Sequence, residues 1–154
     1  MIKLSDFIQE ELVFLDLIPR RKEDIIKALV SAVMKAGLCR SEKILAKVIM
    51  DRELLGSTGI GGGVAIPHGK HSSVKEKAVV IGRSKIPIEF NSADGKPARL
   101  FFLLISPDTE PGQHLKMLAK ISRLIQNDAF REKLMLLPTP RQIIECIKAE
   151  EIKT

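Results

Sequence analysis

The 154-residue chain has no tryptophan and no tyrosine, so its six phenylalanines are its only aromatic residues. A protein of this composition has no aromatic platform on which nucleic-acid bases could stack. Cysteine is equally scarce: Cys39 and Cys146 stand alone, without a spacing motif or a signal peptide. Two such cysteines exclude a disulfide scaffold and predict two packing residues in a reducing, cytoplasmic protein.

Long apolar runs are also missing, and none approaches the ~20 residues that a membrane helix needs. The net charge is +6, but basic residues alternate with acidic ones and form no basic run. This charge favours acidic or phosphorylated partners and argues against a nucleic-acid surface or insertion into a membrane. No repeat or linker divides the sequence, so residues 1–154 are predicted to form a single domain.

Hydrophobic periodicity predicts alternating groups of helices and strands. Ser5 and Asp6 are expected to cap a short opening helix, and Ser41 and Asp128 to cap later ones. The predicted helices cover residues 21–35, 41–53, 111–126, 128–136 and the segment from Thr139 onward. The predicted strands cover residues 12–18, 63–67, 78–84 and 98–106, with a hairpin turn at Asp94-Gly95. We expect an α/β fold, a mixed sheet of about five strands with helices on both faces.

The most unusual segment is "STGIGGGVAIPHGK", Ser57 to Lys70, which holds five of the ten glycines. It is not a nucleotide P-loop, which needs G-x-x-x-x-G-K-[ST]. Here Gly69-Lys70 is followed by His71, and Val64 stands where the first glycine should be. Val64 also occupies the third glycine position of a dinucleotide-binding fingerprint, and the segment continues into Pro67 rather than a helix.

Two other kinds of site use histidine. Three histidines can bind zinc, and this chain has His68, His71 and His114. The proline before His68 disfavours a helix that would align the first two, and His71 is expected to be a surface loop residue. A hydrolase triad of Ser57, His68 and Asp94 is formally available, but no G-x-S-x-G elbow supports it.

His68 differs from the other histidines in its surroundings. It follows a short strand and a proline, and the glycines before it leave backbone N–H groups free to converge on an anion. Arg52 lies just upstream and can contact a phosphate with two N–H groups. His114 is expected in the first turn of a helix, where the dipole disfavours a charged imidazole. These features predict that His68 accepts a phosphoryl group.

The stretch "DRELLGSTGIGGGVAIPHGK" closely resembles the signature of enzyme IIA domains of the bacterial phosphoenolpyruvate:sugar phosphotransferase system. The similar branch is the fructose/mannitol/nitrogen-regulatory one. The resemblance spans essentially the whole chain and includes "DGKPARLFFLLISP" and "HLKMLAKISRLI". Gly62 and Ala98 depart from the usual pattern but touch none of the proposed chemistry. The resemblance implies a phosphotransferase/anion-transport-like three-layer sandwich.

The resemblance also implies roles for individual residues. His68 matches the phosphorylated histidine, His114 the second active-site histidine, and Arg52 the arginine close to the phosphohistidine. Thr58, Gly61 and Gly63 match the loop that lines the phosphate pocket. From the residues themselves, the hydroxyls of Ser57 and Thr58 are expected either to cap the loop or to donate to an anion. The predicted phosphate-pocket residues are Ser57, Thr58, Gly61 and Gly63.

The implied partners are an HPr-type phosphocarrier upstream and, downstream, either a cysteine of a IIB domain or a regulatory target protein. No cofactor and no metal are implied, and the sequence leaves a homo-oligomer open. The opening "MIKLSDFI" and the lack of a fused IIB, IIC or HPr-like segment favour a nitrogen/potassium-type regulatory module. The alternative is a sugar-transport component that passes phosphate to a fructose/mannitol-type IIB.

Overall fold

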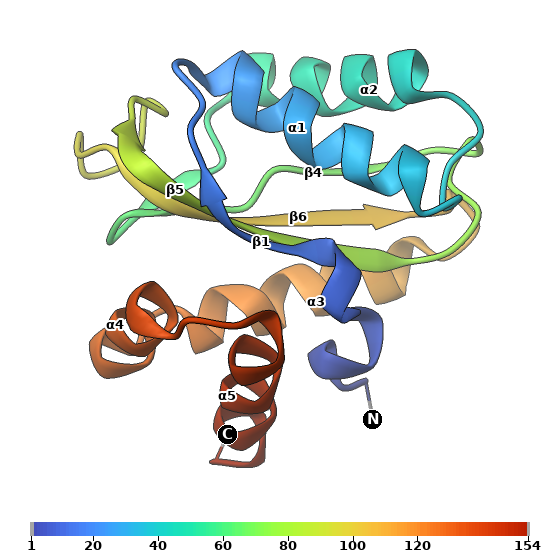
Figure 1. Cartoon of the computed structure of the whole chain (residues 1–154). Coiled ribbons are helices and arrows are strands. Elements are labelled where there is room, and N and C mark those ends of the chain that lie inside the picture. The colour runs from blue at the N-terminus through green and yellow to red at the C-terminus, as the bar shows by residue number, and fades with distance from the viewer. Residues whose placement is uncertain (1, 154) are drawn as a thin grey trace.

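A mixed β-sheet separates two layers of helices in the computed structural model, which describes residues 2–153 (Figure 1). The strands within this range are β1 (Val13–Leu17), β2 (Gly59–Gly61), β3 (Val64–Ala65), β4 (His68–Lys70), β5 (Ala78–Ile88) and β6 (Ala98–Ser106). One face carries α1 (Lys22–Lys35) and α2 (Glu42–Leu55). The opposite face carries α3 (Pro111–Leu124), α4 (Asp128–Leu136) and α5 (Pro140–Lys153). The predicted α/β sandwich is thereby confirmed.

Strand β6 is the centre of the sheet, whose order is β1-β5-β6-β3-β2. It pairs antiparallel with β5 along one edge, and its other edge pairs in parallel first with β3 and then with β4. The two short strands are separated by Ile66 and Pro67, and pairing resumes with His68 opposite Leu104. This interruption in the edge of β6 is where the site described below begins.

Both faces of β6 are buried, as its nearly continuous apolar sequence predicts. Because side chains alternate along a strand, every second residue packs toward α3–α5 and the others toward α1 and α2. The first set is Leu100, Phe102 and Leu104, and the second is Phe101, Leu103 and Ile105. The sheet is therefore fixed between two separate hydrophobic clusters. Both cysteines belong to these clusters, Cys39 buried and Cys146 partly buried, as predicted.

Several local predictions are confirmed and a few are wrong. The Ser41 hydroxyl caps α2 by accepting from Ile44 N, and Gly95 adopts a left-handed φ of 74° in the predicted turn. Besides the strands that the apolar pattern predicts, the sheet contains the glycine-rich β2 and the short β4, neither of which has a strand-like apolar pattern. Asn127, not Asp128, caps α4 because its side chain accepts from Phe130 N.

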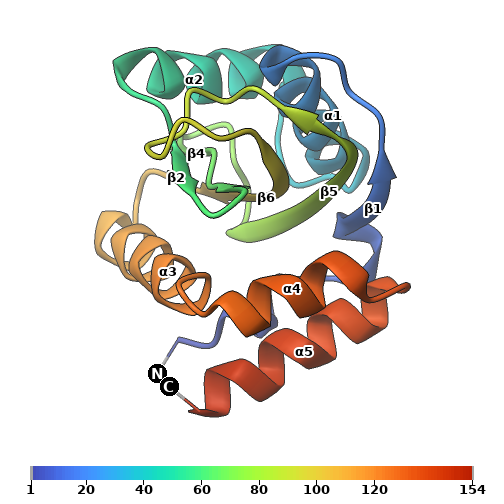
Figure 2. The ribbon, with the colours of Figure 1, turned by 90° about the vertical axis from the view of Figure 1, so that its left-hand side faces the viewer.

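The opening helix is a single 3₁₀ turn, η1 (Leu4–Phe7), followed by a second, η2 (Glu10–Leu12). No side chain caps η1, and Ser5 and Asp6 lie inside it. The turn is held from the other end of the chain, because Leu4 N and Ser5 N donate to the Glu151 carboxylate of α5. Figure 2 shows this N-terminal segment beside α5.

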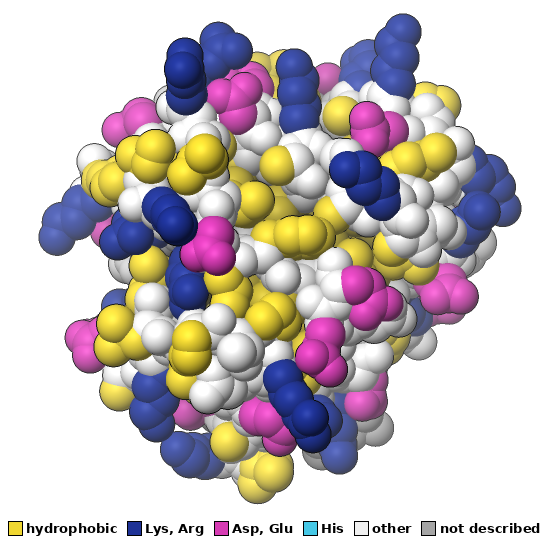
Figure 3. Space-filling model, viewed as in Figure 1, with side chains coloured by type: hydrophobic (Ala, Val, Ile, Leu, Met, Phe, Trp, Pro, Cys, Tyr) yellow, Lys and Arg dark blue, Asp and Glu magenta, His cyan; other side chains and the backbone are white. Residues whose placement is uncertain are grey.

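The surface mixes charges of both signs. On the face shown in Figure 3, lysines and arginines are interspersed with aspartates, glutamates and hydrophobic side chains. This face therefore presents no broad basic patch, in keeping with the sequence pattern. Within residues 2–153, none of the helices combines the length and the apolar character that crossing a bilayer requires.

Candidate active site

His68 is the first residue of β4, and its position is set by the pairing of β4 with β6. Its Nδ1 lies 2.8 Å from the carbonyl oxygen of Ile66. A carbonyl oxygen can only accept, so Nδ1 carries the ring proton and Nε2 keeps its lone pair. Burial lowers the pKa of His68, and the positive charge of Arg52 lowers it further, against the raising effects of the Ile66 carbonyl and Glu53. The ring is therefore neutral, with a nucleophilic nitrogen, near pH 7.

His114 lies in the first turn of α3, as predicted, and is 5% exposed. Its Nδ1 is 2.8 Å from the hydroxyl oxygen of Ser106, the last residue of β6. Burial, followed by the neighbouring His68 and Lys70, lowers the pKa of His114 to about 4. This second imidazole is also neutral at physiological pH. Strand β6 thus positions both histidines, one through its pairing and one through its terminal hydroxyl.

The two histidines share one cavity of about 620 Å³. Their ring centroids are 5.7 Å apart and the ring planes are tilted by 51°. Two cations, Arg52 and Lys70, and an apolar rim from α2 and α3 complete the wall. The lining residues are Val48, Arg52, His68, Gly69, Lys70, Pro111, Gly112, His114, Leu115 and Leu118. Two neutral imidazoles beside two cations form a setting suited to a small anion.

The side chain of Arg52 is held at the end of α2 by a bond to a backbone carbonyl. Its Nη1 donates to the carbonyl oxygen of Gly56, 2.9 Å away, just beyond the last turn of the helix. Gly69 brings this helix close to β4, since a Cβ at that position would lie 2.8 Å from Ile49 Cδ1 and 2.9 Å from Val48 Cγ1. The glycine after the histidine therefore allows Arg52 and His68 to face one cavity.

The glycines before His68 form a β-hairpin turn. Gly61, Gly62 and Gly63 have φ values of 96°, 64° and 79°, a left-handed series that favours glycine at each position. They connect β2 to β3. Gly62 lies against the side chain of Arg131 in α4, since a Cβ at Gly62 would be 2.9 Å from Arg131 Cζ. Gly61 and Gly63 are not among the residues that line the histidine cavity.

The hydroxyls of the same loop are engaged in holding it. Ser57 donates to the carbonyl oxygen of Phe90 and accepts from Gly59 N at 3.0 Å. Thr58 donates its hydroxyl to the carboxylate of Glu53. Of the two roles expected for these hydroxyls, capping the loop is the one that the structure shows. Neither residue lines the cavity, and a direct phosphate contact from either stays a prediction.

The other histidine arrangements are not assembled. His71 Nδ1 lies 3.0 Å from both the backbone N and the hydroxyl of Ser73, in the loop after β4. Asp94 accepts from Gly62 N and Lys96 N, so the triad of Ser57, His68 and Asp94 is not formed. Among residues 2–153, no three His, Cys, Asp or Glu side chains are grouped as metal ligands.

Three polar residues near the site escaped the sequence analysis. Lys70 lies two residues after His68 and could have been noticed as a second cation. Ser106 ends β6, and nothing in its sequence neighbourhood indicates its bond to His114. Glu53 is buried at the end of α2, and its place beside Arg52 in the resembling motif was the one available signal.

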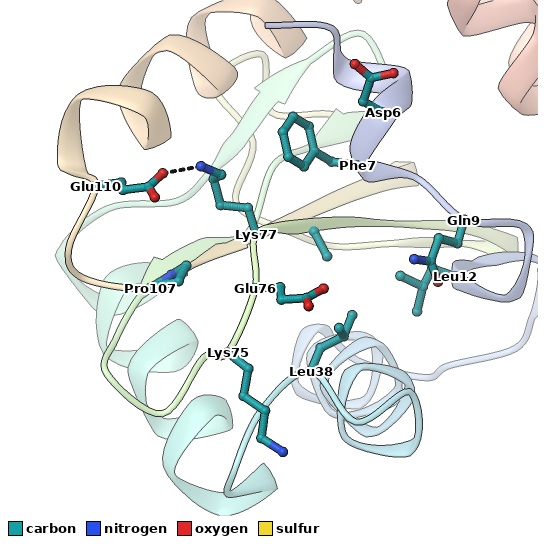
Figure 4. Close-up of a pocket in the computed structure, with 11 residues that line it drawn as sticks. Asp6, Phe7, Gln9, Leu12, Leu38, Lys75, Glu76, Lys77, Pro107 and Glu110 are labelled. Atoms are coloured by element: carbon teal, nitrogen blue, oxygen red, sulfur yellow. Dashed lines mark hydrogen bonds and ion pairs between the residues drawn. The ribbon is translucent and has the colours of Figure 1, made fainter.

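A second cavity, of about 410 Å³, lies between the 3₁₀ turns and the start of α3 (Figure 4). Lys77 forms an ion pair with Glu110 on its wall and also bonds Gln113. No histidine lines this cavity. Because Glu110 precedes α3 and Gln113 lies in its first turn, the lysine anchors the turn that carries His114.

The chain is similar to curated proteins of two kinds, fructose-specific EIIA components and nitrogen regulatory proteins. The chain is 32% identical over 150 residues to the fructose-specific EIIA component of Haloferax volcanii, covering 97% of each chain. It is 41% identical over 95 residues to a nitrogen regulatory protein of Bradyrhizobium diazoefficiens, covering 62% of each. It is 31% identical over 150 residues to the fructose-specific EIIABC component of Bacillus subtilis. That match covers 97% of this chain but only 24% of the length of the relative.

The fold agrees with these relatives. The crystal structure of the nitrogen regulatory protein IIA-Ntr from Neisseria meningitidis superposes with a TM-score of 0.88 at 29% identity, covering 93% of this chain and 97% of that one. Residues 6–150 match the family model described as phosphoenolpyruvate-dependent sugar phosphotransferase system, EIIA 2. The chain therefore belongs to this EIIA family of the phosphoenolpyruvate-dependent sugar phosphotransferase system.

Proposed function

We propose that His68 is the phosphoryl acceptor of this EIIA domain and that Nε2 is the reacting atom. The observation that carries the proposal is the bond from Nδ1 to the Ile66 carbonyl, which leaves the lone pair on Nε2. The donor is an HPr-type carrier that bears a phosphohistidine. In the transfer, the N–P bond of the donor breaks, its electron pair returns to the donor ring, and a new N–P bond forms at Nε2.

Arg52 and His114 stabilise the charge that spreads over the phosphoryl oxygens during transfer. Arg52 has further N–H groups beyond the one that reaches Gly56, and its charge already acts on His68. His114 can present an N–H from its own free nitrogen when the Ser106 hydroxyl donates to Nδ1. Positioning and electrostatics of this kind account for most of the catalysis in phosphoryl transfer.

The experiment is reconstitution with a phosphorylated HPr-type donor, followed by mass spectrometry of the acid-labile adduct. We expect one phosphoryl group per chain, mapped to His68, and none on His68→Ala. Nuclear magnetic resonance of the adduct should place phosphorus on Nε2. Labelling of His68→Ala at the wild-type level would contradict the assignment.

Downstream, we propose that the phosphorylation state of His68 regulates a target protein, as in a nitrogen/potassium-type module. The similarity to nitrogen regulatory proteins supports this role. The alternative, a transport component that passes the group to a cysteine of a fructose/mannitol-type IIB, is supported by the full-length match to a fructose-specific EIIA component. Incubating the phosphorylated chain with such a IIB distinguishes the regulatory role from the transport role. Only the transport role predicts rapid loss of the phosphoryl group from His68.

A further inference from the structure

The carboxylate of Glu53 is buried behind the histidine cavity, with its side chain 1% exposed. It lies 2.8 Å from Lys22 Nζ, accepts from Thr58 N at 3.1 Å, and accepts the Thr58 hydroxyl. Each carboxylate oxygen thus has a partner. A buried carboxylate contributes little net stability, because its desolvation offsets much of what its partners return. Its presence here therefore calls for another explanation.

The bonds of Thr58 continue to His68. The carbonyl oxygen of Thr58 accepts from Ile66 N at 3.0 Å, which fixes the peptide before Ile66. Leu104 N donates to the carbonyl oxygen of Pro67 at 3.0 Å, which fixes the chain on the other side. Between these two anchors the Ile66 carbonyl is directed at His68 Nδ1, 2.8 Å away. Hydrogen bonds linked by the backbone of Thr58 and of Ile66 therefore connect Glu53 to the reactive ring.

We propose that Glu53 is a positioning residue, which acts through Thr58 and Ile66 to hold His68 in the tautomer with its lone pair on Nε2. The inference rests on the proposed function, since it explains why that nitrogen is the reacting one. Neutral imidazole has two tautomers of similar energy, and the acceptor at Nδ1 decides between them. If the Ile66 carbonyl no longer points at Nδ1, part of the population carries its proton on Nε2 and cannot form the N–P bond at that nitrogen.

Lys22 helps to hold the Glu53 carboxylate in place. As the first residue of α1, it brings a cation to Glu53 from a helix that does not line the cavity, and its ammonium also lies 4.4 Å from the ring centroid of Phe90. Glu53 is thereby held between a lysine and the threonine that it orients.

The chain offers a matched control in Glu151, at the far side of the sheet. Its side chain is 5% exposed, it lies 3.0 Å from Lys120 Nζ, and it accepts backbone N–H bonds from Leu4 and Ser5. Glu53 and Glu151 are thus both buried carboxylates, each bonded to one lysine and to backbone N–H. Of the two, only Glu53 is connected to His68. Comparing the Glu53 variant with the Glu151 variant therefore distinguishes an effect on the position of His68 from a general loss of stability.

The test compares Glu53→Gln, Thr58→Val and Glu151→Gln, with Thr58→Ser as the conservative rescue. The ¹⁵N–¹H spectrum of the histidine rings reports the tautomer of His68 without any phosphoryl donor. We expect a mixture of tautomers in Glu53→Gln and Thr58→Val and about tenfold slower phosphorylation at saturating donor, the loss of roughly one hydrogen bond's free energy. The KM for the donor should stay unchanged. Thr58→Ser and Glu151→Gln should keep the wild-type spectrum and rate.

The outcomes distinguish this inference from the proposed function. If the wild-type chain takes no phosphoryl group but the tautomer shifts in the two variants, the positioning role stands and the acceptor role fails. If the wild-type chain is phosphorylated on His68 and both folded variants keep its tautomer and rate, the positioning role is overturned. If Glu53→Gln does not fold, Thr58→Val decides alone. Equal slowing in Glu151→Gln would also overturn it.

Discussion

The start of β4 and the first turn of α3 each present a neutral histidine to the same cavity, but they hold it by different kinds of partner. His68 is bonded to a carbonyl, which can only accept, whereas His114 is bonded to the Ser106 hydroxyl, which can donate or accept. The carbonyl fixes one tautomer and so produces a nucleophile. The hydroxyl leaves the second ring free to present an N–H, which suits a residue that stabilises charge.

The largest effect that sharpens this contrast is expected from His114. His114→Ala removes a donor from the proposed phosphoryl site, and loss of one such donor slows transfer on the order of 100-fold. His114→Gln restores an N–H near the position of Nε2 and should recover part of the rate. Single-turnover transfer from a phosphorylated HPr-type donor measures both. If His114→Ala transfers at the wild-type rate, the histidine is only a packing residue.

A smaller effect is expected from Arg52, the cation whose charge lowers the pKa of His68. Arg52→Lys keeps the charge but loses the planar set of N–H groups, so we expect about tenfold slower transfer, equivalent to one charge-assisted hydrogen bond. Arg40→Lys is the matched control, because Arg40 Nη1 likewise donates to a backbone carbonyl, that of Ser72, at 2.8 Å. A similar slowing in both variants would assign the effect to loop stability.

Gly69→Ala should disturb the packing of β4, which carries His68, and leave α3, which carries His114, unchanged. Its Cβ would press on the side chains of Val48 and Ile49, and overpacking of this kind costs about 1–3 kcal/mol of the free energy of unfolding. Gly112→Ala, in the first turn of α3, meets nothing within 4 Å and should not destabilise the fold. Urea denaturation of both variants gives the comparison. Equal stability would show that β4 and α2 can move apart freely.

The sequence predicted the regular elements well and the polar geometry poorly. The apolar pattern of residues 98–106 matched β6 in full, because both faces of that strand are buried. The resemblance pointed to His68, His114 and Arg52, and all three line one cavity. The loop glycines were expected there as well, but their left-handed φ values serve the β2–β3 hairpin. A glycine sequence shows that the chain must turn, not which surface the turn faces.

The bond partners of the histidines were beyond sequence reasoning for a similar reason. Ser106 lies eight residues before His114, across the turn between β6 and α3. Ile66 bonds His68 through its backbone carbonyl, which every residue type possesses. Which tautomer each ring adopts thus depends on tertiary register and not on the identity of its neighbours in the chain.

The pKa of His114 adds a weaker, pH-dependent difference. Its value falls from 6.5 to about 4 on folding, so between these values the unfolded chain binds a proton that the folded chain does not. This contribution to the free energy of unfolding is complete above about pH 6.5 and is lost as the pH falls toward 4. Thermal melts at several pH values should show wild type losing stability over this range more steeply than His114→Gln. Parallel curves would mean that the ring titrates normally in the folded state.

The smallest effect is expected from His71, the histidine outside the cavity. Within residues 2–153 its ring bonds only Ser73, while its backbone N donates to the Ser106 carbonyl at 3.0 Å. His71→Ala keeps that backbone bond, so Ser106 should still hold His114, and phosphorylation should proceed at the wild-type rate. Intact-mass kinetics with the HPr-type donor, run beside His68→Ala, measures this. A large loss of labelling in His71→Ala would mean that the phosphoryl group visits a second ring, and the contrast between one acceptor and one charge-stabilising histidine would no longer describe the site.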